Sequence, residues 1–282
     1  MGYDYKLKTK SSFLRREDLG ERMNILDKII KDKYKEVTLK KEYIPIQIIE
    51  QLPFFEKQTI SLVNKVKNSK TGIIAEFKRR SPSKSIINDT AIVEDVAIGY
   101  ENAGVSGMSV LTDEIYFGGT TDDLLIARES SNLPLLRKDF VIDEYQLLEA
   151  KAFGADVILL IAAVLTKQEI KHFSEFAKSI GLEVLLEVHN KEELKKSIMP
   201  SIDMLGVNNR NLKTFEVSLE MSKVLANQIP DDFVKVSESG ISTVNAIREL
   251  QPYGYKGFLI GENFMKTDNP GESAKQFIKN LL

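Results

Sequence analysis

The chain has 282 residues, 43% of them hydrophobic, which is enough for one large domain or two small ones. Its 39 Lys and Arg residues nearly balance its 41 Asp and Glu residues, and the net charge of −2 argues against broad attraction to nucleic acids or membranes. There is no cysteine, which excludes disulfides, thiolate metal sites and cysteine nucleophiles, and two histidines argue against a multi-histidine metal site.

The first residues, MGYDYKLKTKSSFL, show no targeting motif. They lack the apolar core of a signal peptide, and Lys6 breaks the myristoylation pattern. No apolar run approaches the length of a membrane span. We therefore expect a cytoplasmic protein without nucleic-acid or membrane partners, which is a monomer or a weak homo-oligomer.

Residues 1–70 precede the first strand-like run and are predicted to form a helical extension. One amphipathic helix is predicted over about 20–38, because its apolar residues recur at helical spacing. Pro45 and Pro53 flank a second helical stretch over 46–51. The pattern leaves open whether the extension caps the bottom of the following domain or covers its active-site face.

After residue 70, short apolar runs alternate with helix-like stretches such as 144–153 and 167–179. Most runs are continuously apolar, as parallel strands covered on both sides are. Eight such units in about 210 residues predict a (β/α)8 TIM barrel over 71–282, with the extension packed on it as one structural domain. A doubly wound open sheet is the alternative, but no G-x-G-x-x-G turn follows the first run. The predicted strands are 72–78, 107–113, 133–140, 156–163, 183–189, 204–211, 234–240 and 257–262.

Seven of the eight predicted strands end in polar or charged residues, and only 156–163 is apolar to its end. In a (β/α)8 barrel these ends converge on one face, where active sites lie. The pattern therefore indicates an enzyme. The polar ends are Glu76/Lys78, Thr112/Asp113, Lys138/Asp139, Glu187/His189, Asn208/Arg210, Glu238/Ser239 and Glu262.

Three of these ends carry groups suited to acid–base chemistry. Glu76 and Lys78 project to the same face of their strand, which is costly unless the pair is functional, although a structural ion pair is the alternative. Lys138 follows an apolar run, and its alternative is a solvated loop lysine. Glu187 has apolar neighbours, which would raise its pKa, as a general base or acid requires, unless a cation such as a neighbouring strand's lysine satisfies it. His189 is expected to be a structural histidine.

The last three strands suggest how an anion would be bound. Asn208 and Arg210 are again two residues apart, and arginine suits bidentate recognition of a carboxylate or phosphate. Asn208 could hydrogen-bond a substrate hydroxyl or shape the turn. The pairs Ser239–Gly240 and Gly261–Glu262 lie where many barrels hold a phosphate through backbone N–H groups, although the glycines could equally serve only the turn.

Eight motifs, in this order and spacing, resemble those of the indole-3-glycerol phosphate synthase family. They lie within residues 72–265, and ILDKIIKDKYKEV at 25–37 resembles the family's N-terminal helix. The resemblance implies a (β/α)8 barrel with an extra N-terminal helical segment. The motifs are IIAEFKRRSPSK, SVLTDEIYFGG, LLRKDF, GADVILLI, EVLLEVH, VNNRNLKTF, VSESGI and GFLIGENFM.

The resemblance implies a reaction of tryptophan biosynthesis that needs no cofactor or metal. In it, the sugar phosphate 1-(2-carboxyphenylamino)-1-deoxyribulose 5-phosphate closes to indole-3-glycerol phosphate, with loss of carbon dioxide and water. Lys138 matches the family's general acid and Glu187 its general base. The remaining implied catalytic residues are Glu76, Lys78 and Asn208. The implied substrate contacts are Ser81, Phe117, Arg210, Ser239, Gly240, Gly261 and Glu262, the last through its backbone.

The resemblance also bears on Lys78, beside Lys138, and on two residues of the loops. Lys78 would hold the substrate carboxylate or share the acid role, and two nearby ammonium groups would make proton donation by Lys138 easier. Ser85 and Thr120 stand where the family often has Gly and Ser, which bears on loop conformation rather than on the type of reaction.

The alternatives to this function are another phosphate-binding barrel enzyme and a non-catalytic barrel scaffold. A phosphate-binding barrel such as phosphoribosylanthranilate isomerase resembles this chain less, because that family uses an Asp/Cys pair and this chain has no cysteine. A non-catalytic barrel scaffold would have lost or replaced its polar strand ends, and here they are present. We therefore expect an enzyme that acts on a small sugar phosphate.

Overall fold

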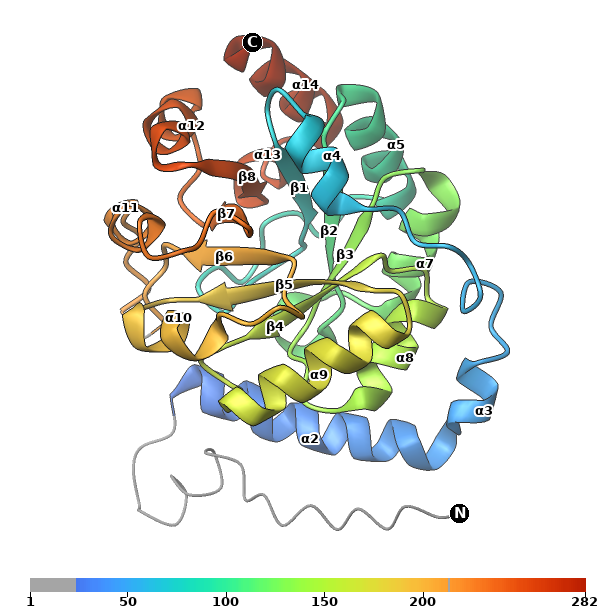
Figure 1. Cartoon of the computed structure of the whole chain (residues 1–282). Helices are drawn as coiled ribbons and strands as arrows, with labels where there is room; N and C mark the ends of the chain where they lie inside the picture. The colour runs from blue at the N-terminus through green and yellow to red at the C-terminus, as the bar shows by residue number, and fades with distance from the viewer. Residues whose placement is uncertain (1–23, 213) are drawn as a thin grey trace.

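The computed structural model describes residues 24–212 and 214–282, and it shows a closed barrel of eight parallel strands surrounded by helices (Figure 1). Each strand pairs with the next along the chain, and β8 pairs with β1 to close the barrel. This confirms the predicted (β/α)8 barrel, and the doubly wound sheet is wrong. The strands are β1 (Ile73–Phe77), β2 (Gly107–Leu111), β3 (Leu135–Lys138), β4 (Val157–Ile161), β5 (Glu183–Val188), β6 (Met204–Asn208), β7 (Val234–Glu238) and β8 (Tyr255–Ile260).

The helices after β1 surround the barrel, and short ones such as α6 and α13 lie in the connections that follow the strands. The predicted helix over 167–179 agrees with α9, and 144–153 agrees with α8 to within one residue. Both begin at a capping box, in which a polar N-cap side chain and the third helical residue satisfy each other's backbone N–H groups. The helices are α5 (Val93–Ala103), α6 (Glu114–Phe117), α7 (Thr121–Ser130), α8 (Glu144–Ala152), α9 (Lys167–Ser179), α10 (Lys191–Ser197), α11 (Glu220–Ala226), α12 (Val244–Leu250), the 3-10 helix η1 (Gln251–Tyr253), α13 (Glu262–Met265) and α14 (Pro270–Leu281).

Side chains alternate in direction along each strand, so that one set fills the inside of the barrel and the other packs between the barrel and the helices. In β1, Ile74 packs inside the barrel, whereas Ile73 and Phe77 pack against the outer helices. Because side chains two residues apart share a face, Glu76 points inward with Ile74. The predicted inward direction of Glu76 is therefore seen in the packing.

The strands end earlier than the sequence suggested, so that the polar residues lie in the last two strand positions or just beyond the strand. Lys138, Asn208 and Glu238 are the last residues of their strands. Asp139 and Ser239 follow immediately in loops. The backbone of these residues is thus held by the hydrogen bonds between neighbouring strands, while the backbone that follows can form a turn.

The N-terminal segment contributes α2 (Ile25–Tyr43), α3 (Ile46–Ile49) and α4 (Leu62–Asn68). The part of the predicted helix over 20–38 that precedes residue 24 lies outside the described residues. At its other end α2 runs past 38 to Tyr43, and it stops before Pro45 because a residue that precedes proline disfavours helical geometry. The helix α4 was not predicted.

The segment contacts both ends of the barrel, so each of the two alternative placements describes one part of it (Figure 1). At the carboxyl ends of the strands, Ile25 and Ile29 of α2 line a cavity. At the opposite end, Leu62 of α4 packs at Gly107, the first residue of β2. There Glu183, which begins β5, accepts hydrogen bonds from the backbone N–H groups of Leu62 and Val63. Within the described part of the chain, no helix combines the length and apolarity that a membrane span requires.

Candidate active site

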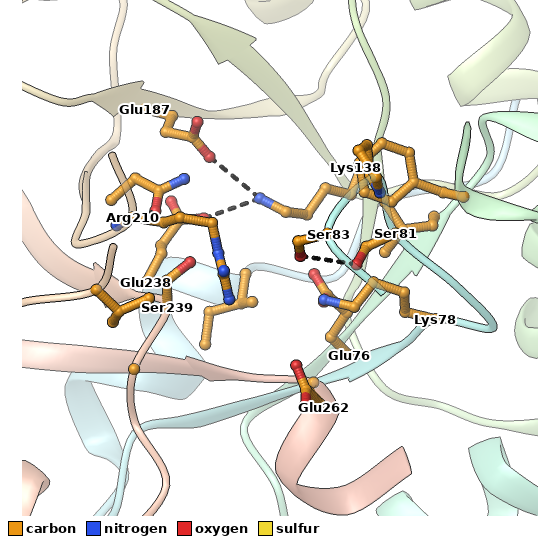
Figure 2. Close-up of a pocket in the computed structure, with 18 of the residues that line it drawn as sticks. Glu76, Lys78, Ser81, Ser83, Lys138, Glu187, Arg210, Glu238, Ser239 and Glu262 are labelled. Carbon is orange, nitrogen blue, oxygen red and sulfur yellow. Dashed lines mark hydrogen bonds and ion pairs between the residues drawn. The ribbon is translucent and has the colours of Figure 1, made fainter. Parts of the chain in front are cut away.

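A cavity of about 550 Å³ opens at the carboxyl ends of the strands (Figure 2). Every residue that the sequence analysis proposed as catalytic or substrate-binding lines it. Helix α2 adds an apolar wall of Ile25, Leu26 and Ile29. Six of the seven predicted polar strand ends therefore contribute at least one side chain to this cavity, while the roles of the individual residues remain predictions.

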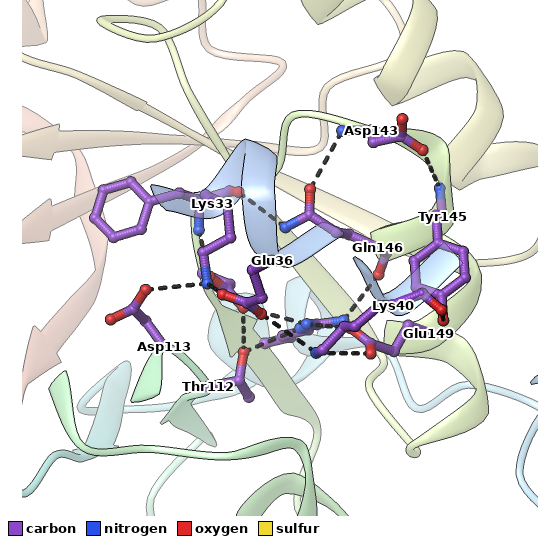
Figure 3. Close-up of polar contacts among 12 residues, drawn as sticks. Lys33, Glu36, Lys40, Thr112, Asp113, Asp143, Tyr145, Gln146 and Glu149 are labelled. Atoms are coloured by element: carbon purple, nitrogen blue, oxygen red, sulfur yellow. Dashed lines mark hydrogen bonds and ion pairs between the residues drawn. The ribbon is translucent and has the colours of Figure 1, made fainter. Parts of the chain in front are cut away.

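Thr112 and Asp113 are the exception, because they do not line the cavity. They belong to a buried polar cluster between α2 and the barrel, in which Lys33 Nζ lies 3.0 Å from both Asp113 Oδ2 and Asp139 Oδ1 (Figure 3). Thr112 Oγ1 donates to Asp139 Oδ2 at 2.7 Å. This polar end is structural because α2 covers it.

Glu76 and Lys78 form the predicted pair. Lys78 Nζ lies 2.6 Å from Glu76 Oε1, and Glu76 is almost fully buried while Lys78 is partly open to the cavity. The second oxygen, Glu76 Oε2, is buried without a hydrogen-bond partner among the described residues. A methyl group at Gly261 would overlap Oε1 of Glu76, so that glycine makes room for the carboxylate.

Lys138 lies between two carboxylates (Figure 2). Its Nζ is 3.2 Å from Glu187 Oε2 and 2.8 Å from Glu238 Oε2. Burial alone would lower the pKa of Lys138, but the carboxylates of Glu238, Glu187 and Glu76 outweigh burial and raise that pKa. The expectation that Lys78 makes Lys138 a readier proton donor is wrong for this structure, because each lysine is paired with carboxylates.

Glu187 is not the isolated carboxylate with a raised pKa that its apolar neighbours suggested. Burial raises its pKa, but Lys138 and His189 oppose burial and hold the pKa below the ordinary value for glutamate. The alternative interpretation, a carboxylate paired with a lysine of another strand, describes the contact that is present. Glu187 is consequently ionised, which is the state that a general base needs.

Glu238 is the residue that the sequence analysis missed, since it was noted only as a polar strand end. It is 1% exposed, its Oε1 has no hydrogen-bond partner among the described residues, and burial together with repulsion from Glu187 raises its pKa. A methyl group at Gly206 would overlap that Oε1. Two signals in the sequence could have pointed to Glu238. It lies two residues after Val236 and so faces inward, and a glycine stands on the adjacent strand.

The turn after β7 has the backbone of an anion site. Ser239 and Gly240 both have positive φ, at 64° and 79°. That conformation is costly for serine, and Asn209 Nδ2 holds it by donating to the carbonyls of Glu238 and Ser239 at 3.0 and 3.1 Å. Successive backbone N–H groups in such a turn can form a concave site for phosphate.

The other predicted anion contacts surround this turn. Asn208 Oδ1 accepts from the backbone N–H of Arg210 at 3.0 Å, which is the turn-shaping role left open for Asn208. Ser81 Oγ lies 3.2 Å from Ser83 Oγ in the loop after β1. Glu262 pairs with Lys84 at 3.0 Å, so its side chain is occupied and its backbone remains the predicted contact.

A parallel eight-stranded barrel with a polar cavity at the carboxyl ends of its strands is the arrangement of TIM-barrel enzymes. Solved structures support the fold. Thiamine phosphate pyrophosphorylase from Pyrococcus furiosus matches with a TM-score of 0.56 at 18% identity, covering 78% of this chain and 98% of that one. KGPDC from Streptococcus mutans matches with a TM-score of 0.57 at 12% identity, covering 74% and 96%. At these identities the likeness concerns the fold alone.

Sequence comparison gives the family. The family model for indole-3-glycerol phosphate synthase matches residues 26–280. A protein of that name from Bacteroides thetaiotaomicron is 48% identical over 258 residues, which is 92% of this chain and 99% of the relative. Another from Caldanaerobacter subterraneus subsp. tengcongensis is 42% identical over 257 residues, covering 91% and 98%. The chain belongs to the indole-3-glycerol phosphate synthase family, and the predicted resemblance is confirmed.

Proposed function

We propose that this protein closes the indole ring of 1-(2-carboxyphenylamino)-1-deoxyribulose 5-phosphate, with loss of carbon dioxide and water, to give indole-3-glycerol phosphate for tryptophan biosynthesis. The family match over residues 26–280 supports the reaction. The structural observation that supports the reaction best is the cluster of charged side chains in the cavity. In it, Lys138 lies within hydrogen-bond distance of Glu187 and Glu238. These are an acid and a base held side by side.

Lys138 would act as the general acid. Because its pKa is raised, its ammonium group carries a proton at neutral pH, which it donates to the ribulose carbonyl oxygen as the ring carbon attacks the carbonyl carbon. The ring carboxylate then leaves as carbon dioxide and gives its bonding electrons back to the ring. Lys78 would hold that carboxylate beforehand or share the acid role.

Glu187 would act as the general base of the dehydration. The hydroxyl formed from the carbonyl leaves as water when a lysine ammonium, Lys78 in its shared acid role or Lys138 once it is protonated again, gives it a second proton. Glu187 removes the proton from the adjacent carbon, which completes the indole double bond. Glu76 and Asn208 would orient substrate hydroxyls, and the unpaired oxygen of Glu76 is an available acceptor. No step in this scheme needs a metal or a cofactor.

Binding would divide the cavity into a phosphate end and an apolar end. The apolar end has Phe117, whose ring centroid is 6.0 Å from that of Phe140, together with the α2 wall; we assign it the aromatic ring of the substrate. The phosphate end would use the turn after β7 and the start of α13. The proposed phosphate contacts are Ser81, Arg210, Ser239, Gly240, Gly261 and Glu262.

We also propose that the protein acts in the cytoplasm as a monomer or a weak homo-oligomer. The substrate assay separates the proposed function from the isomerase alternative. Purified protein is given either the carboxyphenylamino sugar phosphate or the isomerase's own substrate, and products are followed by mass spectrometry. Conversion of the first alone supports the proposal. Conversion of the second, or of neither, contradicts it.

A further inference from the structure

His189 lies behind Glu187 and outside the cavity lining. It follows β5 directly, its side chain is 10% exposed, and its Nε2 is 3.3 Å from Glu187 Oε1. The opposite oxygen, Glu187 Oε2, faces Lys138 at 3.2 Å. The carboxylate is therefore held between a lysine on the cavity side and an imidazole on the other side.

The imidazole itself is fixed by the start of α10. Its Nδ1 lies 3.1 Å from Glu193 Oε2, which also accepts the backbone N–H of His189 at 2.8 Å. Glu193 is held in turn by Asn190, whose Nδ2 donates to Oε1 at 2.8 Å and whose Oδ1 accepts the Glu193 N–H at 2.8 Å. With Nδ1 bound to a carboxylate, the remaining nitrogen has to face Glu187.

The charges around the ring favour its protonated form. Glu187 of β5, Glu193 of α10 and Glu238 of β7 face it, and Lys138 of β3 lies beyond Glu187. Burial lowers the pKa of His189, but the three carboxylates outweigh burial and the net direction is upward. His189 Nε2 makes no aligned hydrogen bond within the described part of the chain, so its contact with Glu187 is one between charges.

We propose that His189 is a positioning residue for Glu187: its imidazolium binds Oε1, keeps the carboxylate ionised, and leaves Oε2 facing Lys138 and the substrate. This is a role beyond the structural histidine that the sequence suggested. Its kinetic consequence rests on the proposed function, whereas the charge coupling between the two side chains does not. The two parts can therefore be tested separately.

The charge coupling is measured by NMR titration of the histidine ring signals. Only His172 and His189 are present, so His172→Gln assigns both signals. We expect Glu187→Gln to lower the titration midpoint of His189 by about one pH unit, because it removes an opposite charge at close range. Glu192→Gln is the matched control, since Glu192 lies on the same helix but is exposed. A His189 midpoint that is unchanged in Glu187→Gln would overturn the proposal.

The kinetic consequence is a pH signature. The imidazolium is present below the pKa of His189 and lost above it, so wild-type kcat should fall to a lower plateau with the midpoint seen by NMR. His189→Gln should have about tenfold lower kcat at low pH, less than a general base contributes, with an unchanged KM, and should meet the wild-type curve at high pH. His172→Gln should keep the wild-type profile.

A parallel loss of kcat by His189→Gln at every pH would mean a merely structural role and would contradict the kinetic part. Should His189→Gln misfold, Glu193→Gln provides the second variant. It should lower the His189 midpoint seen by NMR and move the fall of kcat to the same lower pH. If the wild-type protein fails to convert the substrate, the proposed function fails, and the NMR coupling still decides whether His189 acts on Glu187.

Discussion

The pKa of Lys138 lies above that of a free lysine, because two carboxylates lie within 3.2 Å of its ammonium group. An ammonium group with a raised pKa donates its proton when negative charge develops on a nearby atom. Such charge develops on the carbonyl oxygen during ring closure. The surrounding glutamates thus keep Lys138 protonated, and the carbonyl oxygen becomes basic enough to accept its proton as the ring closes.

Replacing Lys138 by Met should abolish turnover and leave substrate affinity within about tenfold of wild type, because the interaction lost belongs to the transition state. Turnover is measured by steady-state kinetics and affinity by titration calorimetry. Lys67→Met on the exposed end of α4 is the control. Near-normal kcat in Lys138→Met would refute the assignment of the acid.

Glu187→Gln should be similarly damaging, because an amide cannot remove the proton during dehydration. The same kinetic assay applies, and binding should again persist. If the variant kept most of the wild-type kcat, the base would have to be another residue, and Glu238 is the nearest candidate since it shares Lys138.

Gly206→Ala should reduce kcat by about tenfold or more, because the added methyl group displaces Glu238 from Lys138 and small displacements in a catalytic group are costly. Gly104→Ala is the matched control. Its φ of 81° strains an alanine, but no atom of the described residues lies within 4 Å of the added carbon. The control should therefore lose stability and keep its kcat, and equal kcat in both variants would argue against a role for Gly206.

At the scale of elements, α2 is fastened to the barrel by a buried cluster of charges (Figure 3). Lys33 is 1% exposed and contacts carboxylates on the loops after β2 and β3. On the far side of Asp139, Arg137 bridges to Glu149 of α8 at 2.6 Å. Arg137 and Asp139 flank Lys138 in sequence, so the cluster also holds the strand end that presents the proposed acid.

Lys33→Met should cost about 3–5 kcal/mol of folding free energy, since it removes the cation that Asp113 and Asp139 share and leaves Asp139 with Arg137 alone. Urea unfolding measures this cost. Lys35→Met, on the exposed face of the same helix, removes a surface pair and should cost at most about 1 kcal/mol. Equal effects of the two substitutions would show that the cluster contributes little.

The same cluster predicts how stability depends on pH. Burial raises the pKa of Asp139, but Lys33 and Arg137 outweigh it, so the folded pKa lies below its ordinary value of 3.8. A carboxyl of this kind stabilises the fold above about pH 4 and loses that contribution as the pH falls towards its folded pKa. The stability difference between wild type and Asp139→Asn, followed by urea unfolding, should therefore shrink on acidification. A difference that grew would contradict this sign.

The elements also show where sequence reasoning succeeded and where it stopped. The alternation of short apolar runs with helix-like stretches identified every strand of the barrel and the bounds of α9, because local pattern and burial agree there. The helix α4 has only seven residues, and its start depends on Glu183, which is remote in sequence. The contacts of Lys33 are likewise long-range, and no periodicity could have revealed them.

For the whole molecule, the closed barrel is what turns separated residues into a site. Each predicted site residue lies at or just beyond a strand end or in one of the loops that follow, so closure of β1 onto β8 brings them to one cavity. Their protonation states could not be predicted, because these depend on which strand neighbours share a cation. Glu187 and Glu238 illustrate this, since both contact Lys138 and yet their pKa values move in opposite directions.

The roles of Lys138 and Glu187 both depend on one activity, the decarboxylating ring closure. The most direct measurement incubates the wild-type protein with 1-(2-carboxyphenylamino)-1-deoxyribulose 5-phosphate and follows carbon dioxide release together with indole fluorescence, against which a chain without tryptophan contributes little background. We expect one carbon dioxide for each indole product, formed over many turnovers. Consumption of substrate without an indole product, or no reaction by folded protein, would contradict it.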